Sequence, residues 1–337
     1  MRTSTRTRSL GVLAAVVLTL GACGTPGSGG GQAETEPTSA AGGPPACAPV
    51  AGETLVVLED DKGLQNADNV LPAVNAQVAA EHPTVLELLD AVSAALDTDR
   101  LIELNRAVDV ERRTSAEVAQ DFVAEKSLAA TDATAGAGTT LTVGAANFSE
   151  SITLAEIYAA VLRSAGFATE ARTIGARETY LPALQSGEVA VVPEYAATLA
   201  TFLNGQVNGA DAPPVASSDV DETVAALTPL AAESGLVVGA PSEAQDQNAF
   251  AVTAEFAAEH GLETLSDLAA SCGGVVLAGP PECPERPFCQ IGLEETYGLS
   301  VGEFKSYDFA LIGQAVRQGD AAVGLVTSSD GSLAPRG

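Results

Sequence analysis

The sequence predicts an α/β fold, and two observations along residues 141–204 lead to this prediction. Short apolar stretches alternate with helical ones, and Gly166 and Gly187 stand where the helical stretches should stop. Strand, helix, strand, helix, strand is the order of a parallel sheet with helices on its faces. Ser149 and Glu150 are expected to cap and begin the first helix. We expect strands at residues 141–144, 168–174 and 189–192, and helices at residues 154–165 and up to Gly187.

The N-terminus has the layout of an export signal. Three arginines precede an apolar run at residues 10–20, which is too short to span a bilayer as a mature helix. The string Leu20-Gly-Ala-Cys23 resembles the lipobox of bacterial lipoproteins. We therefore expect residues 1–22 to be a lipoprotein signal peptide and Cys23 to carry a lipid that anchors the protein outside the cytoplasm, at the cell membrane. An ordinary secretory signal with an incidental cysteine is the alternative.

Composition limits the partners and the domain plan. Residues 23–46 consist almost entirely of Gly, Pro, Ser, Thr, Ala and Glu, and they are expected to form a flexible tether. The chain carries a formal net charge of −28, so its surface should repel phosphate backbones and anionic lipid headgroups. This excludes nucleic acid and electrostatic membrane binding. The remaining length is sufficient for one globular protein of two domains, which we expect to be a monomer.

Four cysteines besides Cys23 make an even number in an exported chain, which predicts two disulfides. Three pairings are possible. The short loop from Cys283 to Cys289 favours a local bridge, which leaves Cys47 to pair with Cys272. A zinc site is the alternative, but neither a CxxC pair nor a histidine accompanies these cysteines in the sequence, and we expect no metal.

Several strings resemble the substrate-binding proteins of ABC importers for glycine betaine, choline and related quaternary amines. They are Asn147-Phe-Ser-Glu150, residues 178–184, Gly187-Glu188, and Pro193-Glu-Tyr-Ala-Ala-Thr198. The resemblance implies a periplasmic-binding-protein-like fold of type II, in which two α/β lobes enclose a ligand cleft. Such proteins close around their ligand by a hinge motion.

The order of the strings is permuted relative to this family. Leu55-Val-Val-Leu-Glu-Asp-Asp-Lys-Gly63, Leu104-Asn-Arg-Ala-Val-Asp-Val110 and Glu117-Val-Ala-Gln-Asp-Phe122 resemble the family's C-terminal part but stand before its first half. We interpret this as a circular permutation, with residues 129–140 joining the old ends and new ends near Thr54 and Gly331. An unrelated helical domain at residues 47–128 is the alternative.

This interpretation sets the expected lobes and helices. The first lobe would span residues 67–244, and the second would combine residues 47–66 with residues 245–337. Within the displaced part, helices are expected at residues 72–80, 85–96, 99–108 and 115–124.

In the resembled family, a box of tyrosines holds the trimethylammonium head of the ligand and hydrogen-bond donors hold its carboxylate. Carried over by motif, the resemblance implies substrate-binding roles for Tyr195, Thr198 and Arg286. It implies the same for the turn formed by Asn147, Phe148 and Ser149, where a helix N-terminus could donate to an anion.

The other family aromatic positions differ here, since Asn248, Asp68 and Thr327 stand at them. Together with Gln65, Asn66 and Gln247, these residues predict a polar, partly acidic pocket. Such a pocket would suit a ligand that has hydrogen-bonding groups as well as positive charge better than it suits glycine betaine. Carnitine-like, choline-like and betaine-histidine compounds are candidates.

The predicted function is that of a solute-binding lipoprotein that delivers a small zwitterionic or cationic solute to an ABC permease driven by its ATPase subunit. We expect no catalytic residues and no cofactor, because the sequence has no G-x-S-x-G, H-E-x-x-H, P-loop or EF-hand string. An exported enzyme, and a lobe-closing sensor or binding lipoprotein for another polar ligand, are the alternatives.

Overall fold

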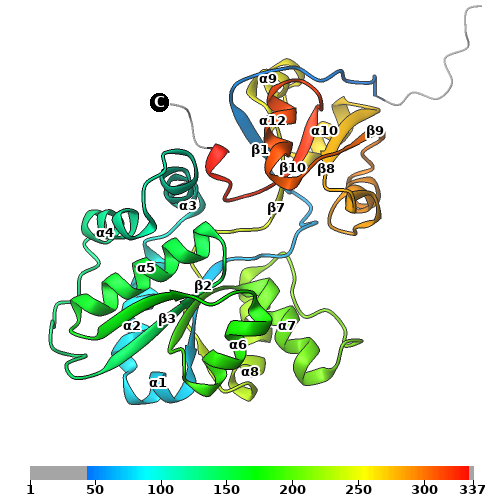
Figure 1. Ribbon diagram of the computed structural model, residues 1–337. Coiled ribbons are helices and arrows are strands. Elements are labelled where there is room, and N and C mark those ends of the chain that lie inside the picture. The colour runs from blue at the N-terminus through cyan, green and yellow to red at the C-terminus, as the bar shows by residue number, and fades with distance from the viewer. Residues whose placement is uncertain (1–43, 334–337) are drawn as a thin grey trace, which may run out of the picture. The chain divides into compact units, whose positions relative to one another are not determined.

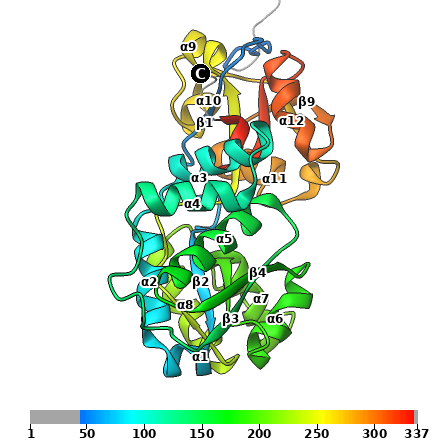
Figure 2. The same cartoon turned by 60° about the vertical axis from the view of Figure 1, so that its left-hand side comes forward.

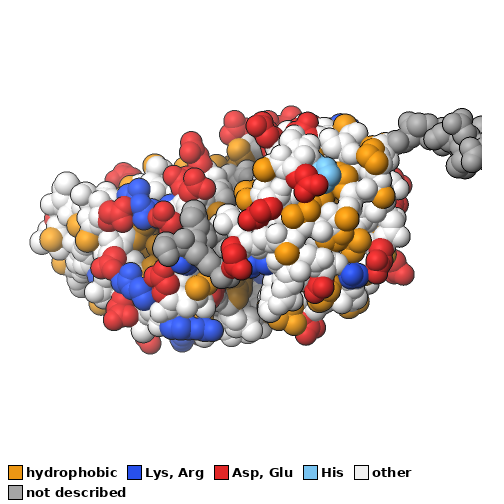
Figure 3. All heavy atoms as spheres, turned by 90° about the horizontal axis from the view of Figure 1, so that it is seen from above, with side chains coloured by type: hydrophobic (Ala, Val, Ile, Leu, Met, Phe, Trp, Pro, Cys, Tyr) orange, Lys and Arg blue, Asp and Glu red, His pale blue; other side chains and the backbone are white. Residues whose placement is uncertain are grey.

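The computed structural model describes residues 44–333. The predicted signal peptide at residues 1–22, the predicted lipid attachment at Cys23, and most of the predicted tether lie outside this range. No helix within residues 44–333 combines the length and the hydrophobicity that a membrane crossing requires. Acidic side chains are spread over the face seen in Figure 3, with fewer basic ones among them, as the net charge of −28 leads one to expect.

Ten strands form two five-stranded mixed sheets within the described range (Figure 1). The first sheet contains β2 (Val70–Asn75), β3 (Thr140–Ala145), β4 (Ala168–Thr173), β5 (Val191–Tyr195) and β6 (Leu236–Val238). The second contains β1 (Leu55–Leu58), β7 (Asn248–Thr253), β8 (Val275–Gly279), β9 (Val301–Ser306) and β10 (Val323–Thr327).

The two sheets have the same topology. Their orders are β4-β3-β5-β2-β6 and β9-β8-β10-β7-β1. In the first, β3 is parallel to β4 and β5, and β2 runs antiparallel to its two neighbours. In the second, β8 is parallel to β9 and β10, and β7 is the antiparallel strand. The parallel order predicted for residues 141–192 is therefore confirmed, within sheets that each include one reversed strand.

The helices connect and cover these strands, and Figures 1 and 2 both show α4 alongside α5. They are α1 (Ala76–Glu81), α2 (Pro83–Ala94), α3 (Thr98–Asn105), α4 (Ser115–Glu125), α5 (Ser149–Ser164), α6 (Arg177–Ser186), α7 (Ala196–Asn208), α8 (Val220–Glu233), α9 (Ala254–His260), α10 (Leu265–Ser271), α11 (Gln290–Gly292) and α12 (Ile312–Arg317). A π-helical turn, η1 (Arg106–Val110), continues α3.

Two sequence predictions about local structure were wrong. The helix expected at residues 72–80 begins only at Ala76, where the Asn75 side chain accepts hydrogen bonds from the first backbone amides. Residues before it form β2, which is buried along its whole length and pairs with β5 and β6. Pro72 lies opposite Pro193 of β5, so the two residues that lack an amide hydrogen face each other.

The second wrong prediction concerns the start of α5. Phe148, and not Ser149, is the residue that precedes the first helical turn, and it provides no side-chain cap. Ser149 is already helical, and its hydroxyl donates instead to Oδ2 of Asp109 at 3.0 Å. The first-turn amides of α5 therefore depend on groups other than a serine cap.

Buried apolar side chains gather around each sheet separately. Two clusters contain residues between 70 and 244, and two others contain residues between 47 and 58 and between 249 and 326. The helix α5 contributes most to the first group, with its apolar face against β3 and β4. Each sheet thus has its own hydrophobic core.

The chain passes between the two sheets along residues 59–69 and 239–247. These segments lie side by side, since Asn69 and Gln245 form an antiparallel bridge and the backbone N–H of Asp246 donates to the carbonyl of Asp68 at 3.1 Å. Polar side chains of both segments are thereby brought to one place in the fold.

Candidate functional site

A pocket of ≈ 560 Å³ lies at this crossing. Its walls come from both connecting segments, from α6 and α7, and from the second sheet and its loops. They are Gln65, Asn66, Asp68, Arg177, Ala197, Thr198, Thr201, Phe202, Asp246, Gln247, Asn248, Phe288 and Thr327. The structure thus brings together four residues to which the sequence assigned a binding role: Asp68, Thr198, Asn248 and Thr327.

Asp68 is nearly buried, with 7% of its surface exposed. Its Oδ1 accepts a hydrogen bond from the backbone N–H of Thr198 at 3.0 Å. This bond forms because α7 begins after Tyr195 without a side-chain cap of its own, so its first amides need an acceptor from elsewhere. Burial raises the pKa of Asp68 to about 7, although the Thr198 bond and the positive charge of Arg177 act in the opposite direction.

Arg177 is the basic residue among the pocket walls, and its guanidinium is already paired. It donates from Nη2 and Nε to the two carboxylate oxygens of Glu194, at 2.8 and 3.1 Å. Glu194 is fully buried in β5 and also accepts from the hydroxyl of Tyr180 at 2.8 Å. A third bond runs from Nη2 of Arg177 to Oγ1 of Thr198 at 2.9 Å, which ties the ion pair to the pocket wall.

Two phenylalanines supply aromatic surface. Phe202 lies on α7, with the Arg177 guanidinium 5.9 Å from its ring centroid. Phe288 is 42% exposed and lies in the loop that the Cys283–Cys289 disulfide closes. The Gln65 side chain donates to the Phe288 carbonyl at 3.0 Å, which holds this loop against the connecting segment. Aromatic faces at this position can attract a cation.

Tyr195 lies behind the pocket and is not one of its wall residues. Its ring is 93% buried, and its hydroxyl donates to Oε1 of Glu150 at 2.5 Å. Asn105 donates to Oε2 of the same carboxylate, also at 2.5 Å, and Ser329 donates to Asp246 at 2.8 Å. Burial and the neighbouring charge of Asp246 raise the pKa of Glu150, because the two acids compete for one buried region.

The other residues with predicted binding roles also lie outside the pocket walls. Asn147 and Phe148 are exposed ahead of α5, with the Phe148 ring centroid 6.2 Å from that of Tyr195. Ser149 bonds to Asp109, as described above. Arg286 is exposed in the Cys283–Cys289 loop, two positions before Phe288. Ligand contacts by these residues, and by Tyr195, stay predictions.

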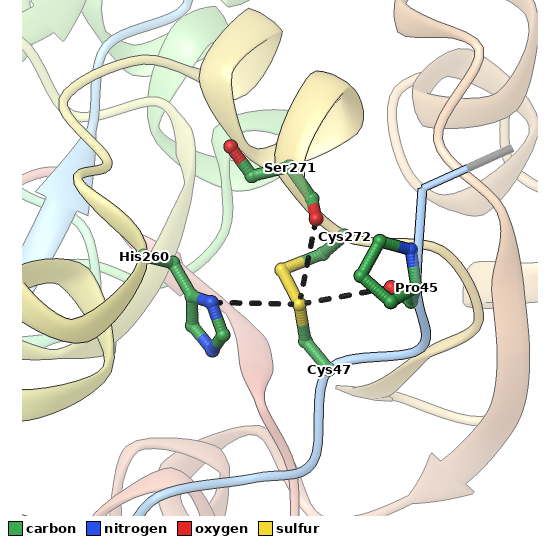
Figure 4. Close-up of a disulfide and its surroundings, with 5 residues drawn as sticks. All are labelled: Pro45, Cys47, His260, Ser271 and Cys272. Carbon is green, nitrogen blue, oxygen red and sulfur yellow. Dashed lines mark hydrogen bonds between the residues drawn. A yellow bond between two sulfur atoms is a disulfide. The ribbon is translucent and has the colours of Figure 1, made fainter.

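Two disulfides join Cys47 to Cys272 and Cys283 to Cys289, the pairing that the sequence favoured. One detail of the zinc alternative needs correction, since a histidine does accompany the first pair. Nδ1 of His260 lies 3.7 Å from Sγ of Cys47 (Figure 4). The three side chains are close enough to surround a metal ion, but sulfur atoms joined in a disulfide are not the thiolates that bind zinc.

Sequence reasoning missed Arg177, Phe202 and Phe288. One signal for Arg177 was present, because Glu194 stands inside an apolar strand and a buried carboxylate requires a cationic or hydrogen-bonding partner. Nothing in the sequence identified which arginine that partner would be. The two phenylalanines carried no signal, since other phenylalanines, such as Phe148 and Phe309, are exposed outside the pocket.

Two α/β units joined by crossing segments, with a polar pocket at the crossing, are the arrangement in which solute-binding proteins close around a ligand by a hinge. Within this class, the chain is a member of the family described as the substrate binding domain of ABC-type glycine betaine transport systems. That family matches residues 49–125 and 139–335. The family is one of binding domains and not of enzymes.

Individual relatives match shorter stretches. The glycine-betaine-binding protein of Pseudomonas aeruginosa is 38% identical over 74 residues, which are 22% of this chain and 24% of the relative. The glycine betaine-binding protein YehZ of Escherichia coli is 35% identical over 78 residues, or 23% of this chain and 26% of the relative. The matched stretches thus span about a quarter of these curated relatives.

A solved structure supports the fold. The ligand-free structure of YehZ from Escherichia coli aligns with a TM-score of 0.51 at 21% identity, covering 58% of this chain and 72% of that one. At this identity the likeness concerns the fold alone.

Proposed function

We propose that this protein is the extracytoplasmic solute-binding component of an ABC importer and captures a quaternary amine of the betaine and choline type. In this proposal it delivers the solute to a permease, and the partner ATPase subunit supplies the energy. The observation that carries the proposal is the ≈ 560 Å³ pocket at the crossing between the sheets, with acidic and aromatic walls. The family membership and the names of the relatives point to the same class of solute.

The charges of the pocket support a positively charged ligand. Asp68 and Asp246 line it, whereas the guanidinium of Arg177 is neutralised by the buried carboxylate of Glu194. A quaternary ammonium group has no N–H to donate, so carboxylates and aromatic faces are the groups that can hold it. Phe202 and Phe288 supply such faces.

Calorimetric titration of the purified protein with glycine betaine, choline and carnitine tests this function. We expect at least one of them to bind, and Phe288→Ala to weaken that binding about tenfold, because the variant removes an aromatic contact to the cation. Phe309→Ala is the matched control, since Phe309 is equally exposed at 43% but lies outside the pocket walls. Absence of binding across the panel would contradict the proposed function.

We also propose that the chain is a circular permutant, with lobes at residues 67–244 and at residues 47–66 together with 245–337. The proximity of the two proposed new ends supports this, because one guanidinium contacts the chain near both of them. Arg317 donates to the carbonyl of Glu53 at 3.1 Å and to that of Ser332 at 2.6 Å. Residues 129–140 are the proposed joint, and the gap between the two stretches that match the family, residues 126–138, overlaps them.

A reordered chain tests the permutation: residues 139–333 followed directly by residues 53–128 should fold and bind the same ligand. Because this chain leaves out Cys47, it carries Cys272→Ala and is compared with the Cys47→Ala/Cys272→Ala variant of the chain in its present order. Loss of cooperative unfolding in this chain would contradict the proposal.

The lipid anchor at Cys23 is likewise a proposal, and mass spectrometry of the N-terminal peptide of the membrane-bound protein would find either a lipidated or a free cysteine.

A further inference from the structure

Three groups close to the pocket could hold the carboxylate of a zwitterionic ligand, and each already faces a carboxylate of the chain itself. In the first turn of α7, the backbone N–H of Thr198 donates to Oδ1 of Asp68. The guanidinium of Arg177 is bonded through two nitrogens to Glu194. At the start of α5, the Ser149 hydroxyl donates to Asp109.

Helix N-termini and arginines are the usual holders of anions in proteins. At the start of α7 and at Arg177 the chain fills these positions with its own side chains, and Glu194 is fully buried, so a ligand cannot easily displace it. The walls also include a second acid, Asp246, whose carboxylate accepts from Ser329. A ligand carboxylate entering this pocket would therefore meet like charge.

From this arrangement we infer that the pocket selects monocations without a carboxylate over zwitterionic betaines, and that Asp68 is the residue that determines this specificity. The inference rests on the proposed function and narrows it. It departs from the solute for which the family is named, since glycine betaine carries a carboxylate as well as a quaternary ammonium group.

Asp68 is suited to this role by its position. It is 93% buried at the crossing, and its hydrogen bond to the start of α7 fixes one carboxylate oxygen. The charged groups that face it are Arg177 from α6 and Asp246 from the second connecting segment, and the amides of α7 complete its surroundings. Since Arg177 is paired with Glu194, an arriving cation would be the first group to compensate Asp68 fully.

Binding should then depend on pH in a defined direction. A cation binds to the ionised form of Asp68 and stabilises it. In molecules whose Asp68 is protonated, binding therefore requires the release of that proton. Because burial raises the pKa of Asp68 to about 7, the affinity for a cation should rise with pH up to about 7 and level off above it. Glu150 and Asp246 also have raised pKa values, so only the part of the pH dependence that Asp68→Asn removes belongs to Asp68.

The experiment is a calorimetric comparison of choline with glycine betaine, which share the trimethylammonium head and differ in carrying a hydroxyl or a carboxylate. With the wild-type protein at pH 8, we expect choline to bind at least tenfold more tightly than glycine betaine. At pH 6 this ratio should fall about tenfold. Asp68→Asn keeps an acceptor for the Thr198 amide, and it should weaken choline about tenfold or more without weakening glycine betaine.

One control accompanies this comparison. Asp132→Asn removes an exposed carboxylate outside the pocket and should leave both affinities unchanged. Glycine betaine binding as tightly as choline at pH 8, or an unchanged ratio in Asp68→Asn, would overturn the inference and leave the proposed function standing. If neither compound bound, the inference would fall, and the proposed function would fall with it if carnitine did not bind either.

Discussion

Replacing Arg177 by methionine is expected to lower the free energy of unfolding by about 3–5 kcal/mol. The variant leaves Glu194, which is fully buried, with a charge that has lost its partner, and this is the situation in which breaking an ion pair is most destabilising. The remaining donors are the Tyr180 hydroxyl and the backbone N–H of Tyr195, and neither brings a positive charge. Denaturant unfolding of the wild type and the variant, followed by circular dichroism, measures the loss.

The double variant Arg177→Met/Glu194→Gln separates a lost charge partner from lost packing. A glutamine at position 194 is neutral and can still accept from Tyr180, so most of the stability should return. The matched control is Arg172→Met, which breaks the exposed pair of Arg172 and Glu188, also joined at 3.1 Å. That change should cost less than about 1 kcal/mol. An equally small loss in Arg177→Met would contradict the prediction. No recovery in the double variant would show that the loss comes from packing and not from the unpaired charge of Glu194.

The fold could be predicted from the sequence where apolar runs are bounded by clear stop signals. The strands β3 and β5 and the helix α5 follow from short apolar runs, helical periodicity and a glycine after the helix. The strand β4 is mostly polar, and only its place between two helices indicated it. The strand β2 could not be predicted in this way. Its run is apolar on both faces and so has no period of two, and Pro72 argued against a strand. Pairing with Pro193 opposite, which only the tertiary structure reveals, explains why the proline is tolerated.

The candidate site was predictable only where the chain carries motifs of the resembled family. Asp68, Asn248 and Thr327 stand at positions that the family fills with aromatic residues, and all three line the pocket at the crossing between the sheets. Arg177 pairs with a residue 17 positions away, and Phe288 depends on a loop closed by a disulfide. Such contacts depend on how separate elements pack, which local sequence does not specify. The same limit explains why His260, 213 positions from Cys47, escaped notice as its neighbour.

Removal of the Cys47–Cys272 disulfide is expected to lower the free energy of unfolding by as much as breaking the buried ion pair does. This bridge joins residues 225 positions apart, whereas the Cys283–Cys289 bridge spans 6 positions. A cross-link stabilises mainly by reducing the conformational entropy of the unfolded chain, and the effect grows with the logarithm of the loop length. The loop lengths alone predict a loss of about 5 kcal/mol for the long bridge and about 2 kcal/mol for the short one.

The two bridges provide their own matched comparison. All four cysteines are at most 5% exposed, so replacing a pair by alanine removes similar amounts of buried sulfur in each case. The free energies of unfolding of Cys47→Ala/Cys272→Ala and Cys283→Ala/Cys289→Ala should therefore differ by about 3 kcal/mol, and this difference reflects the two loop lengths. Denaturant unfolding under non-reducing conditions measures this difference. A reducing agent should lower the free energy of unfolding of the wild type by the sum of both losses. Equal losses in the two double variants would contradict the prediction, because they would mean that closing the long loop costs the unfolded chain no more than closing the short one.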